Sequence, residues 1–229
     1  MNKLRALLLA LAAGLATHDG RAGTVDLPLQ IGGAYSVPAT SLREARYGAT
    51  VRQQYDFSCG SAALSTLLTH HYGHAVTEQQ VFEQMFQRGD RAKIQREGFS
   101  LLDMKRYLEA HGYEANGFEA PLDKLVRANI PAIVLINENG YNHFVVVKGV
   151  RDERVLIGDP AGGARALRRD AFEAMWVNQI VFVILNRQER SKFNVASDWV
   201  TVPGAPIASG MRREGLAGTA FPRLGPSDF

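Results

Sequence analysis

The sequence predicts an α+β domain in which helices come first along the chain and strands follow. In the first half, apolar residues recur at helical spacing, as at Leu64, Leu67, Leu68 and Tyr72. In the second half, they form short continuous runs such as residues 130–136, bounded by turn residues. With 229 residues and 46% hydrophobic content, the chain can bury a globular core. Segregated helices and strands are typical of the α+β class.

Ordinary signals mark where the helices start and stop. Thr77 and Ser100 are good N-caps, and Gly73 and Gly112 are natural stops. Pro121 suits the first turn of a short helix, because its missing N–H would have no partner there. Helices are therefore expected at residues 60–72, 77–87, 100–112, 121–129 and about 168–176.

Runs of β-branched and other apolar residues mark the strands. Residues 151–154 form a four-residue turn that joins two of these runs into a hairpin. Strands are expected at residues 113–118, 130–136, 143–150, 155–160 and 180–185. The charged run 88–97 between two helices is interpreted as a solvated loop that could border a substrate groove.

The chain divides into four segments by composition. The first is a signal peptide and the second an irregular segment rich in glycine and proline. The third is the folded domain and the fourth an irregular tail, with a short strand near Trp199 and Val200. The boundaries are expected at residues 1–22, 23–47, 48–186 and 187–229.

The N-terminus has the features of an export signal. Lys3 and Arg5 make it positive, residues 6–15 form a short apolar core, and small residues follow. Cleavage is expected after Ala22, with Ala16 as the alternative. The apolar core is short for a membrane span, and a buried N-terminal helix or an uncleaved anchor is the other interpretation. We expect the mature protein in the periplasm or at the outer surface.

The charge balance gives no sign of a nucleic-acid partner. The signal segment contains Lys3, Arg5 and Arg21 against Asp19, so its removal lowers the net charge from +3 to +1. The chain has no basic tract and no repeat of basic and aromatic residues. Binding of nucleic acid is therefore not expected.

Cys59 is the only cysteine, so the chain has no internal disulfide. It stands where a loop-like stretch ends and a helical pattern begins. Unpaired N–H groups and the helix dipole favour negative charge at that position, which predicts a lowered thiol pKa and a nucleophile. A buried structural cysteine is the alternative, because free cysteines are often buried.

Acyl chemistry at a thiol needs a base and a group that orients the base. His143, at the start of a strand, is the best candidate base. Asp159 follows it by 16 residues across a hairpin, which can bring the two side chains together because neighbouring strands lie about 5 Å apart. Asn142 and Asp152 are weaker candidates for the orienting group. An ordinary strand-edge histidine and an Asp-Pro turn are the alternatives.

A glutamine precedes the cysteine at a useful spacing. Gln53 lies six residues before Cys59, and its amide can donate to an oxyanion while the Cys59 N–H supplies a second donor. Spacing alone does not distinguish Gln53 from Gln54.

The candidate catalytic residues, taken together, resemble the pattern of a known family. Gln53, the run C-G-S-A-A-L that starts at Cys59, then His143 and finally Asp159-Pro160 resemble the C39 peptidase family in order and spacing. The resemblance covers residues 48–186. Family members are papain-like cysteine peptidases, known best as domains of bacteriocin-exporting transporters that cleave leader peptides after a Gly-Gly pair.

The resemblance implies a papain-like fold in which a helical half with the cysteine at a helix start packs on an antiparallel sheet carrying the histidine and aspartate. It implies that Cys59 is the nucleophile, His143 the base, Asp159 its orienting residue and Gln53 the oxyanion donor. The chain is similar to stand-alone exported members, one of which accompanies a functional-amyloid secretion machinery. A protein or peptide substrate, with or without Gly-Gly sites, and components of a secretion machinery are the implied partners.

Two other functions use the same groove. One is a non-catalytic binding factor that holds a glycine-rich peptide during secretion. The other is amidase or transfer chemistry on cell-wall peptides. The reactivity of the Cys59 thiol separates the binding factor from an enzyme.

No cofactor or metal is expected. His70 and His74 have the i, i+4 spacing of a metal pair, but no acidic or cysteine ligand lies at motif spacing. A cationic helix C-terminus explains these histidines more simply. The glycine-rich residues 158–163 lack a phosphate-loop lysine, which argues against nucleotide binding.

Overall fold

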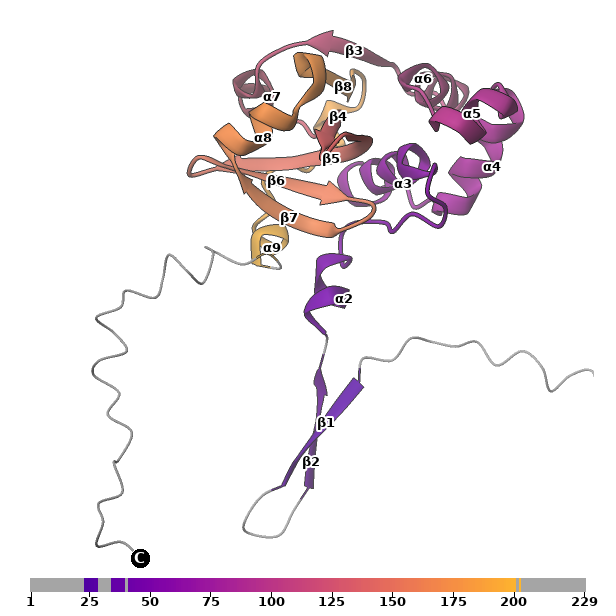
Figure 1. The fold of residues 1–229 in the computed structure, drawn as a ribbon. Helices are drawn as coiled ribbons and strands as arrows, with labels where there is room; N and C mark the ends of the chain where they lie inside the picture. The colour runs from indigo at the N-terminus through magenta and orange to yellow at the C-terminus, as the bar shows by residue number, and fades with distance from the viewer. Residues whose placement is uncertain (1–22, 29–33, 40, 201, 203–229) are drawn as a thin grey trace, which may run out of the picture. The chain divides into compact units, whose positions relative to one another are not determined.

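The computed structural model describes residues 23–28, 34–39, 41–200 and 202 and divides the chain into two compact units (Figure 1). The first unit ends at Leu42, and the second begins at Arg43 and carries every candidate site residue. The expected signal segment lies outside the described residues, as does the end of the expected tail from residue 203 onward. Within the described part, none of the helices has the length and apolar character needed to cross a bilayer.

The first unit contains an antiparallel hairpin of β1 (Gly23–Pro28) and β2 (Ala34–Ala39). The expectation of an irregular segment at residues 23–47 is therefore wrong at this hairpin and at the short helix α2 (Leu42–Arg46). Pro38 is tolerated in β2 because both strands of a two-stranded ribbon are edge strands.

The second unit is built on a six-stranded antiparallel sheet with the strand order β3-β8-β4-β5-β6-β7. The strands are β3 (Ala115–Glu119), β4 (Ala132–Glu138), β5 (Tyr141–Arg151), β6 (Arg154–Asp159), β7 (Gly163–Arg168) and β8 (Ile180–Ile184). The long strand β5 lies near the middle and is joined by tight turns to β4 and β6. The start of β5 thus pairs with β4, and β6 joins the other side of β5 from Val146 onward.

Helices cover both faces of this sheet (Figure 1). They are α3 (Cys59–Thr66), which continues as the π-helical turn η1 (Leu67–His71), α4 (Glu78–Arg88), α5 (Arg91–Glu97), α6 (Leu101–Ala110), α7 (Leu122–Ala128) and α8 (Arg169–Met175). Shorter pieces are η2 (Val177–Gln179), η3 (Gln188–Arg190) and α9 (Ala196–Val200).

Alternate strand residues enter two separate cores because side chains of a strand point to opposite faces. Ile133 and Val146 pack with the apolar sides of α3, α4 and α6. Val134, Val145 and Val147 pack with α7 and α8 on the other face. Because helices cover both faces of the sheet, the side chains on both sides of these strands are apolar, and their sequences are continuous apolar runs.

The predicted caps and strands are largely confirmed. Thr77 forms a capping box with Gln80, and Ser100 forms one with Asp103. The helical first half, the antiparallel second half and the helix start at Cys59 are also as expected. The α+β class therefore follows from local sequence signals that agree with the tertiary fold.

Two elements of the domain differ from the prediction. The charged run expected as a loop contains helix α5, which Asp90 caps by accepting a hydrogen bond from the Lys93 N–H. Only Ile94 of this helix is buried, so the sequence shows no apolar stripe there. Strand β7 was not predicted, because its residues 163–168 mix glycine, alanine and arginine rather than forming an apolar run.

The first part of the tail is folded onto the domain. Phe193 and Val202 are buried, and residues near Trp199 form the helix α9 in place of the predicted strand. The Nζ of Lys148, on β5, is fully buried and lies 2.8 Å from Oδ2 of Asp198 in α9. This contact could not be predicted, because no local pattern shows which acidic residue neutralises a lysine within a strand.

We expect Asp198→Ala to destabilise the domain by about 3–5 kcal/mol, because it leaves the Lys148 charge buried without its carboxylate. Urea denaturation of the full chain measures this loss. Glu97→Ala is the matched control, since Glu97 pairs with Lys93 and Arg96 where all three side chains are more than half exposed. That variant is expected to lose less than about 1 kcal/mol. If both variants lost the same free energy of unfolding, the buried Lys148–Asp198 pair would not have the stabilising role given to it here.

Acid is expected to weaken the attachment of the tail through His71. The Nδ1 of this buried ring lies 2.6 Å from the Lys192 carbonyl oxygen. Burial lowers the pKa of His71 from the usual 6.5 to about 4, and the charge of Lys148 contributes less to the same shift. Between pH 6.5 and 4 the unfolded chain binds a proton that the folded chain excludes. The unfolding free energy should therefore fall by about 3 kcal/mol over this range.

Urea denaturation at pH 7 and pH 4.5 measures this effect. The charged groups around His71 are Lys148, Asp198, Lys192 and His70, and His70, whose pKa burial also lowers, adds to the same curve. His71→Asn keeps an amide donor for Lys192 and removes the titration, so its stability should fall less on acidification. The prediction fails if wild type and variant lose the same stability.

Candidate active site

Cys59 is the first residue of α3, and the loop before it is held by its own hydrogen bonds. The Ser58 hydroxyl donates to the Tyr55 carbonyl oxygen and accepts from the Tyr55 N–H, at 3.0 and 3.1 Å. The Ala62 N–H donates to the Ser58 carbonyl oxygen, which closes the first turn of the helix. Every residue of α3 is buried. Cys59 therefore stands on a rigid support.

Burial raises the pKa of the Cys59 thiol. The backbone N–H groups of Phe144, Gly60 and Cys59 itself act in the opposite direction, and the negative charge of Asp159 adds to the increase. The expectation that the helix start gives a lowered thiol pKa is therefore wrong. The helix start does provide N–H donors, but the loss of solvation outweighs them.

Strand β5 brings His143 to the start of α3. The N–H of Phe144, which follows His143, interacts with the Cys59 thiol, and Phe144 packs in the same apolar cluster as Cys59. His143 is buried and pairs with Ile136 of β4 in the sheet register. A histidine in a paired strand is held more firmly than one in a loop.

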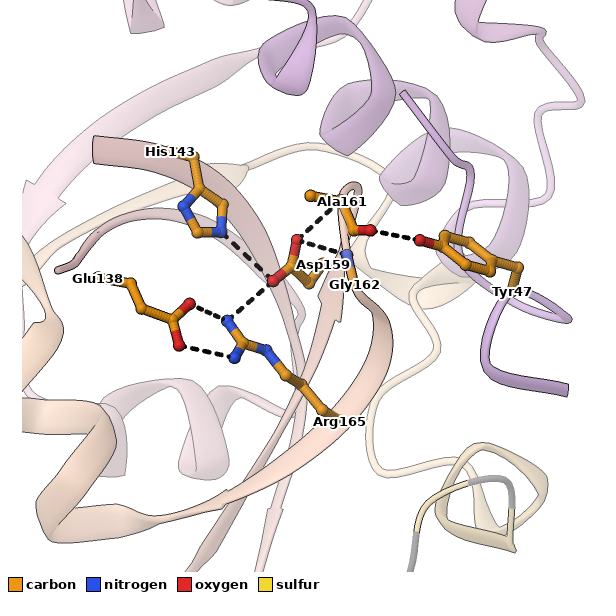
Figure 2. Close-up of polar contacts among 7 residues, drawn as sticks. All are labelled: Tyr47, Glu138, His143, Asp159, Ala161, Gly162 and Arg165. Carbon is orange, nitrogen blue, oxygen red and sulfur yellow. Dashed lines mark hydrogen bonds and ion pairs between the residues drawn. The ribbon is translucent and has the colours of Figure 1, made fainter. Parts of the chain in front are cut away.

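The two ring nitrogens of His143 have different surroundings. Nε2 lies 3.3 Å from Oδ2 of Asp159, at the end of β6, as the hairpin predicted (Figure 2). A carboxylate only accepts, so Nε2 carries the proton of the neutral ring. Nδ1 is buried and has no hydrogen-bond partner among the described residues. The lone pair of Nδ1 is therefore available to accept a proton.

Asp159 is buried, with both carboxylate oxygens engaged. Oδ1 accepts from the N–H groups of Ala161 and Gly162 at 2.8 and 3.2 Å, and Oδ2 faces His143 and Nη2 of Arg165, the latter at 2.8 Å (Figure 2). Burial alone would raise the pKa of this carboxyl. The hydrogen bond and charge of His143, the Ala161 N–H and the charge of Arg165 lower it instead. Asp159 is accordingly a carboxylate.

Sequence reasoning missed Arg165 and Glu138. Arg165 lies on β7 and binds Glu138, at the end of β4, through two hydrogen bonds of 2.9 and 2.6 Å. Ligand atoms of Glu138, His143 and Asp159 lie within 4.8 Å of one another, as in a site that could hold a metal ion. The Arg165 guanidinium, bonded to both carboxylates, already supplies a cation there. We therefore assign no metal to this cluster.

Gln53 lies in the loop that leads to Cys59. Its backbone N–H donates to the Pro160 carbonyl oxygen at 3.1 Å, which joins this loop to the end of β6 beside Asp159. Its side-chain amide donates to the Tyr55 carbonyl oxygen at 3.1 Å. Gln53 is half-buried, whereas Gln54 is exposed. The structure thus separates two glutamines that spacing could not.

The weaker orienting candidates are not bonded to His143. The side chain of Asn142 is exposed and accepts a hydrogen bond from the Asn137 amide. Asp152 lies in the turn between β5 and β6, at the other end of β5 from His143. Asp159 is the acidic residue paired with His143.

An open cleft of about 280 Å³ reaches Cys59. The loop before α3, the end of α5 and the start of β5 form its walls. The Tyr141 hydroxyl donates to the Asp56 carbonyl oxygen at 3.0 Å, which links two of these walls, and the Tyr141 ring stacks on His143 with centroids 5.7 Å apart. The charged run predicted as a possible groove border does border this cleft, as helix α5. Cys59 thus lines a cleft that is open to solvent.

Comparisons with known proteins agree with this geometry. The family model described as Peptidase C39 family matches residues 48–188. A Pseudomonas fluorescens protein named "Probable functional amyloid protease FapD" is 41% identical over 186 residues, covering 81% of this chain and 80% of that protein. The Pseudomonas aeruginosa protein of the same name is 40% identical over 185 residues, covering 80% and 81%.

A solved structure shows the same fold. The peptidase domain of Streptococcus ComA, a bi-functional ABC transporter involved in quorum sensing, matches with a TM-score of 0.50 at 20% sequence identity. The match covers 59% of this chain and 96% of that domain. It confirms the expected papain-like arrangement of helices and antiparallel sheet. On the family match over residues 48–188, the chain belongs to the peptidase C39 family of cysteine peptidases.

Proposed function

We propose that this peptidase is exported and cleaves a peptide bond of a secreted protein, with Cys59 as nucleophile, His143 as base, Asp159 as its orienting residue and Gln53 as oxyanion donor. The observation that supports this best is the state of His143. Its Nε2 is bonded to a buried carboxylate, and its Nδ1 has no partner among the described residues. A general base requires this arrangement of an oriented ring with one open nitrogen.

The raised thiol pKa favours a resting state with a neutral thiol. When a peptide carbonyl enters the cleft, the Cys59 sulfur attacks its carbon while Nδ1 of His143 takes the thiol proton. The resulting imidazolium is stabilised by the Asp159 carboxylate, 3.3 Å from Nε2. The thiolate is therefore a minor species of the free protein and forms mainly as the sulfur attacks.

The tetrahedral intermediate carries its negative charge on the former carbonyl oxygen. The Cys59 N–H, at the start of α3, and the Gln53 amide supply donors for it. One Gln53 amide hydrogen bonds the Tyr55 carbonyl oxygen, which leaves the other for substrate. His143 then protonates the leaving amine, and water attacks the acyl-enzyme to release the acid and restore the thiol.

The sequence and the relatives support the proposed location and substrate. The expected signal at residues 1–22 directs the chain to the periplasm, with the outer surface as the alternative. The relatives named functional amyloid proteases favour a substrate from an amyloid secretion system, with components of that machinery as partners. Cleavage after a Gly-Gly pair is the family's precedent, although it belongs to cytoplasmic relatives.

The raised pKa of Cys59 favours a second candidate function. A buried thiol with little thiolate at neutral pH fits a non-catalytic factor that holds a peptide in the cleft during secretion. In that case His143 and Asp159 would be structural groups.

A comparison of protein N-termini tests the proposal. Exported proteins are collected from cells with the wild-type chain and from cells with Cys59→Ala, and their N-termini are identified. We expect at least one new N-terminus to depend on Cys59. If the two sets are identical while the substrate still binds, the binding factor is supported. If the two sets are identical and zymography shows that only the wild-type chain cleaves peptidoglycan peptides, the chemistry is that of a cell-wall amidase.

A further inference from the structure

Arg165 joins the two carboxylates nearest to His143. Its Nη2 lies 2.8 Å from Oδ2 of Asp159 and 2.6 Å from Oε2 of Glu138, and its Nη1 lies 2.9 Å from Oε1 of Glu138. Figure 2 shows the guanidinium between these two groups, with His143 bonded to the same Asp159 oxygen. The sheet order β4-β5-β6-β7 makes this possible, because it aligns the ends of four neighbouring strands.

We propose that Arg165 and Glu138 are a charge-balanced positioning pair for the proposed peptidase. Arg165 fixes the oxygen of Asp159 that orients His143. Glu138 cancels the Arg165 charge, so that His143 can become an imidazolium during the reaction. This inference rests on the proposed role of His143 and adds two residues that act through Asp159.

The contacts of Asp159 support the fixing role. Oδ1 is held by two backbone N–H groups, from Ala161 and Gly162, and Oδ2 is held by Arg165 in addition to His143. A carboxylate held at both oxygens cannot rotate about its terminal bond. Arginine suits this task because its planar fork binds two carboxylates in fixed directions.

The charges support the balancing role. An arginine beside the His143–Asp159 pair would by itself disfavour a second positive charge on the ring. Glu138 forms a two-bond ion pair with Arg165, so the three groups Glu138, Arg165 and Asp159 carry the same net charge as Asp159 alone. Among the described residues, the Tyr141 ring stacks on His143, and Cys59 lies beside Phe144, the next residue along β5. The expected effect of each substitution therefore has a defined sign.

The test is the pH dependence of Cys59 alkylation by iodoacetamide, measured on the full chain. Glu138→Gln leaves an unbalanced positive charge, which favours proton loss from the Cys59–His143 pair. The midpoint of the alkylation curve should move down by about one pH unit. Arg165→Gln leaves an unbalanced negative charge, so the midpoint should move up by a similar amount. The double variant restores the balance and should return the midpoint to that of wild type.

Two further variants separate positioning from general stability. Arg165→Lys keeps the charge but loses the fork, so the midpoint should stay and the rate should fall about tenfold. Arg169→Gln is the matched control, because Arg169 bridges Asp123 and Glu173 on the surface and has no contact with His143 in the described structure. Its curve should be that of wild type.

Opposite shifts in the two single variants support the pair. Unchanged midpoints, or shifts in the same direction, would overturn it while leaving the proposed peptidase intact. If the thiol of His143→Ala is alkylated at the same rate as the thiol of wild type, the proposed function and this inference both fail. Glu138→Gln and Arg165→Lys keep the test decisive even if Arg165→Gln does not fold.

Discussion

Cys59→Ala is expected to abolish peptide hydrolysis and to leave the fold intact. The mechanism has no other nucleophile, because Cys59 is the only cysteine of the chain and the thiol in the cleft. Loss of a catalytic nucleophile lowers kcat by at least about 10⁴-fold. Cleavage of the protein identified from the N-terminal comparison, by purified wild type and variant, measures the effect.

The fold should survive this substitution for two reasons. Alanine is the best helix former, and position 59 is the first residue of α3. Removing one buried sulfur atom should lower the unfolding free energy by only about 1 kcal/mol. Cys59→Ser, which keeps the size of the side chain, is the control and should be equally inactive. Processing at the wild-type rate by either variant would remove the peptidase proposal.

Gln53→Ala is expected to lower kcat by about 100- to 1000-fold with little change in KM. An oxyanion donor is used in the transition state and not in the ground state, so its removal affects the chemical step and not binding. The Gln53 backbone N–H, which bonds Pro160, is retained in the variant, so the loop should keep its place. Steady-state kinetics on the identified substrate measure both constants.

The neighbouring glutamine provides a matched control for this experiment. Gln54 has the same side chain, but it is exposed where Gln53 is half-buried and bonded to Tyr55. Gln54→Ala should therefore have wild-type kcat. Equal kcat values for the two variants would show that the oxyanion is held without Gln53.

The pairing of His143 with Asp159 could be predicted from the sequence because it depends on a hairpin. A strand, a short turn and a returning strand fix which residues meet, and each of these leaves a local pattern. The start of α3 at Cys59 is another local feature, marked by the change from loop to apolar period.

Contacts between distant segments could not be predicted in this way. Arg165 reaches Asp159 only through β7, a strand whose composition has no apolar run. Lys148 is neutralised by Asp198 from the expected tail, 50 positions later in the chain. Both contacts depend on the tertiary packing of charged groups, for which a single sequence has no periodic signal.

The thiol environment shows a different limit. The sequence identified the donors at the helix start correctly, but the pKa depends on the balance between those donors and solvation. Burial of Cys59 depends on Phe144 and the apolar cluster around it, which come from the other half of the chain. The sign of the pKa shift could therefore not be read from position alone.

The central claim is that β5 delivers an imidazole that activates the sulfur at the start of α3. Alkylation of the Cys59 thiol by iodoacetamide at pH 7, in wild type and in His143→Ala, tests it most directly. We predict that the wild-type thiol reacts about 100-fold faster than the thiol of the variant, as expected when a general base is lost. Equal rates would contradict the claim, because the thiol would then react without help from the histidine.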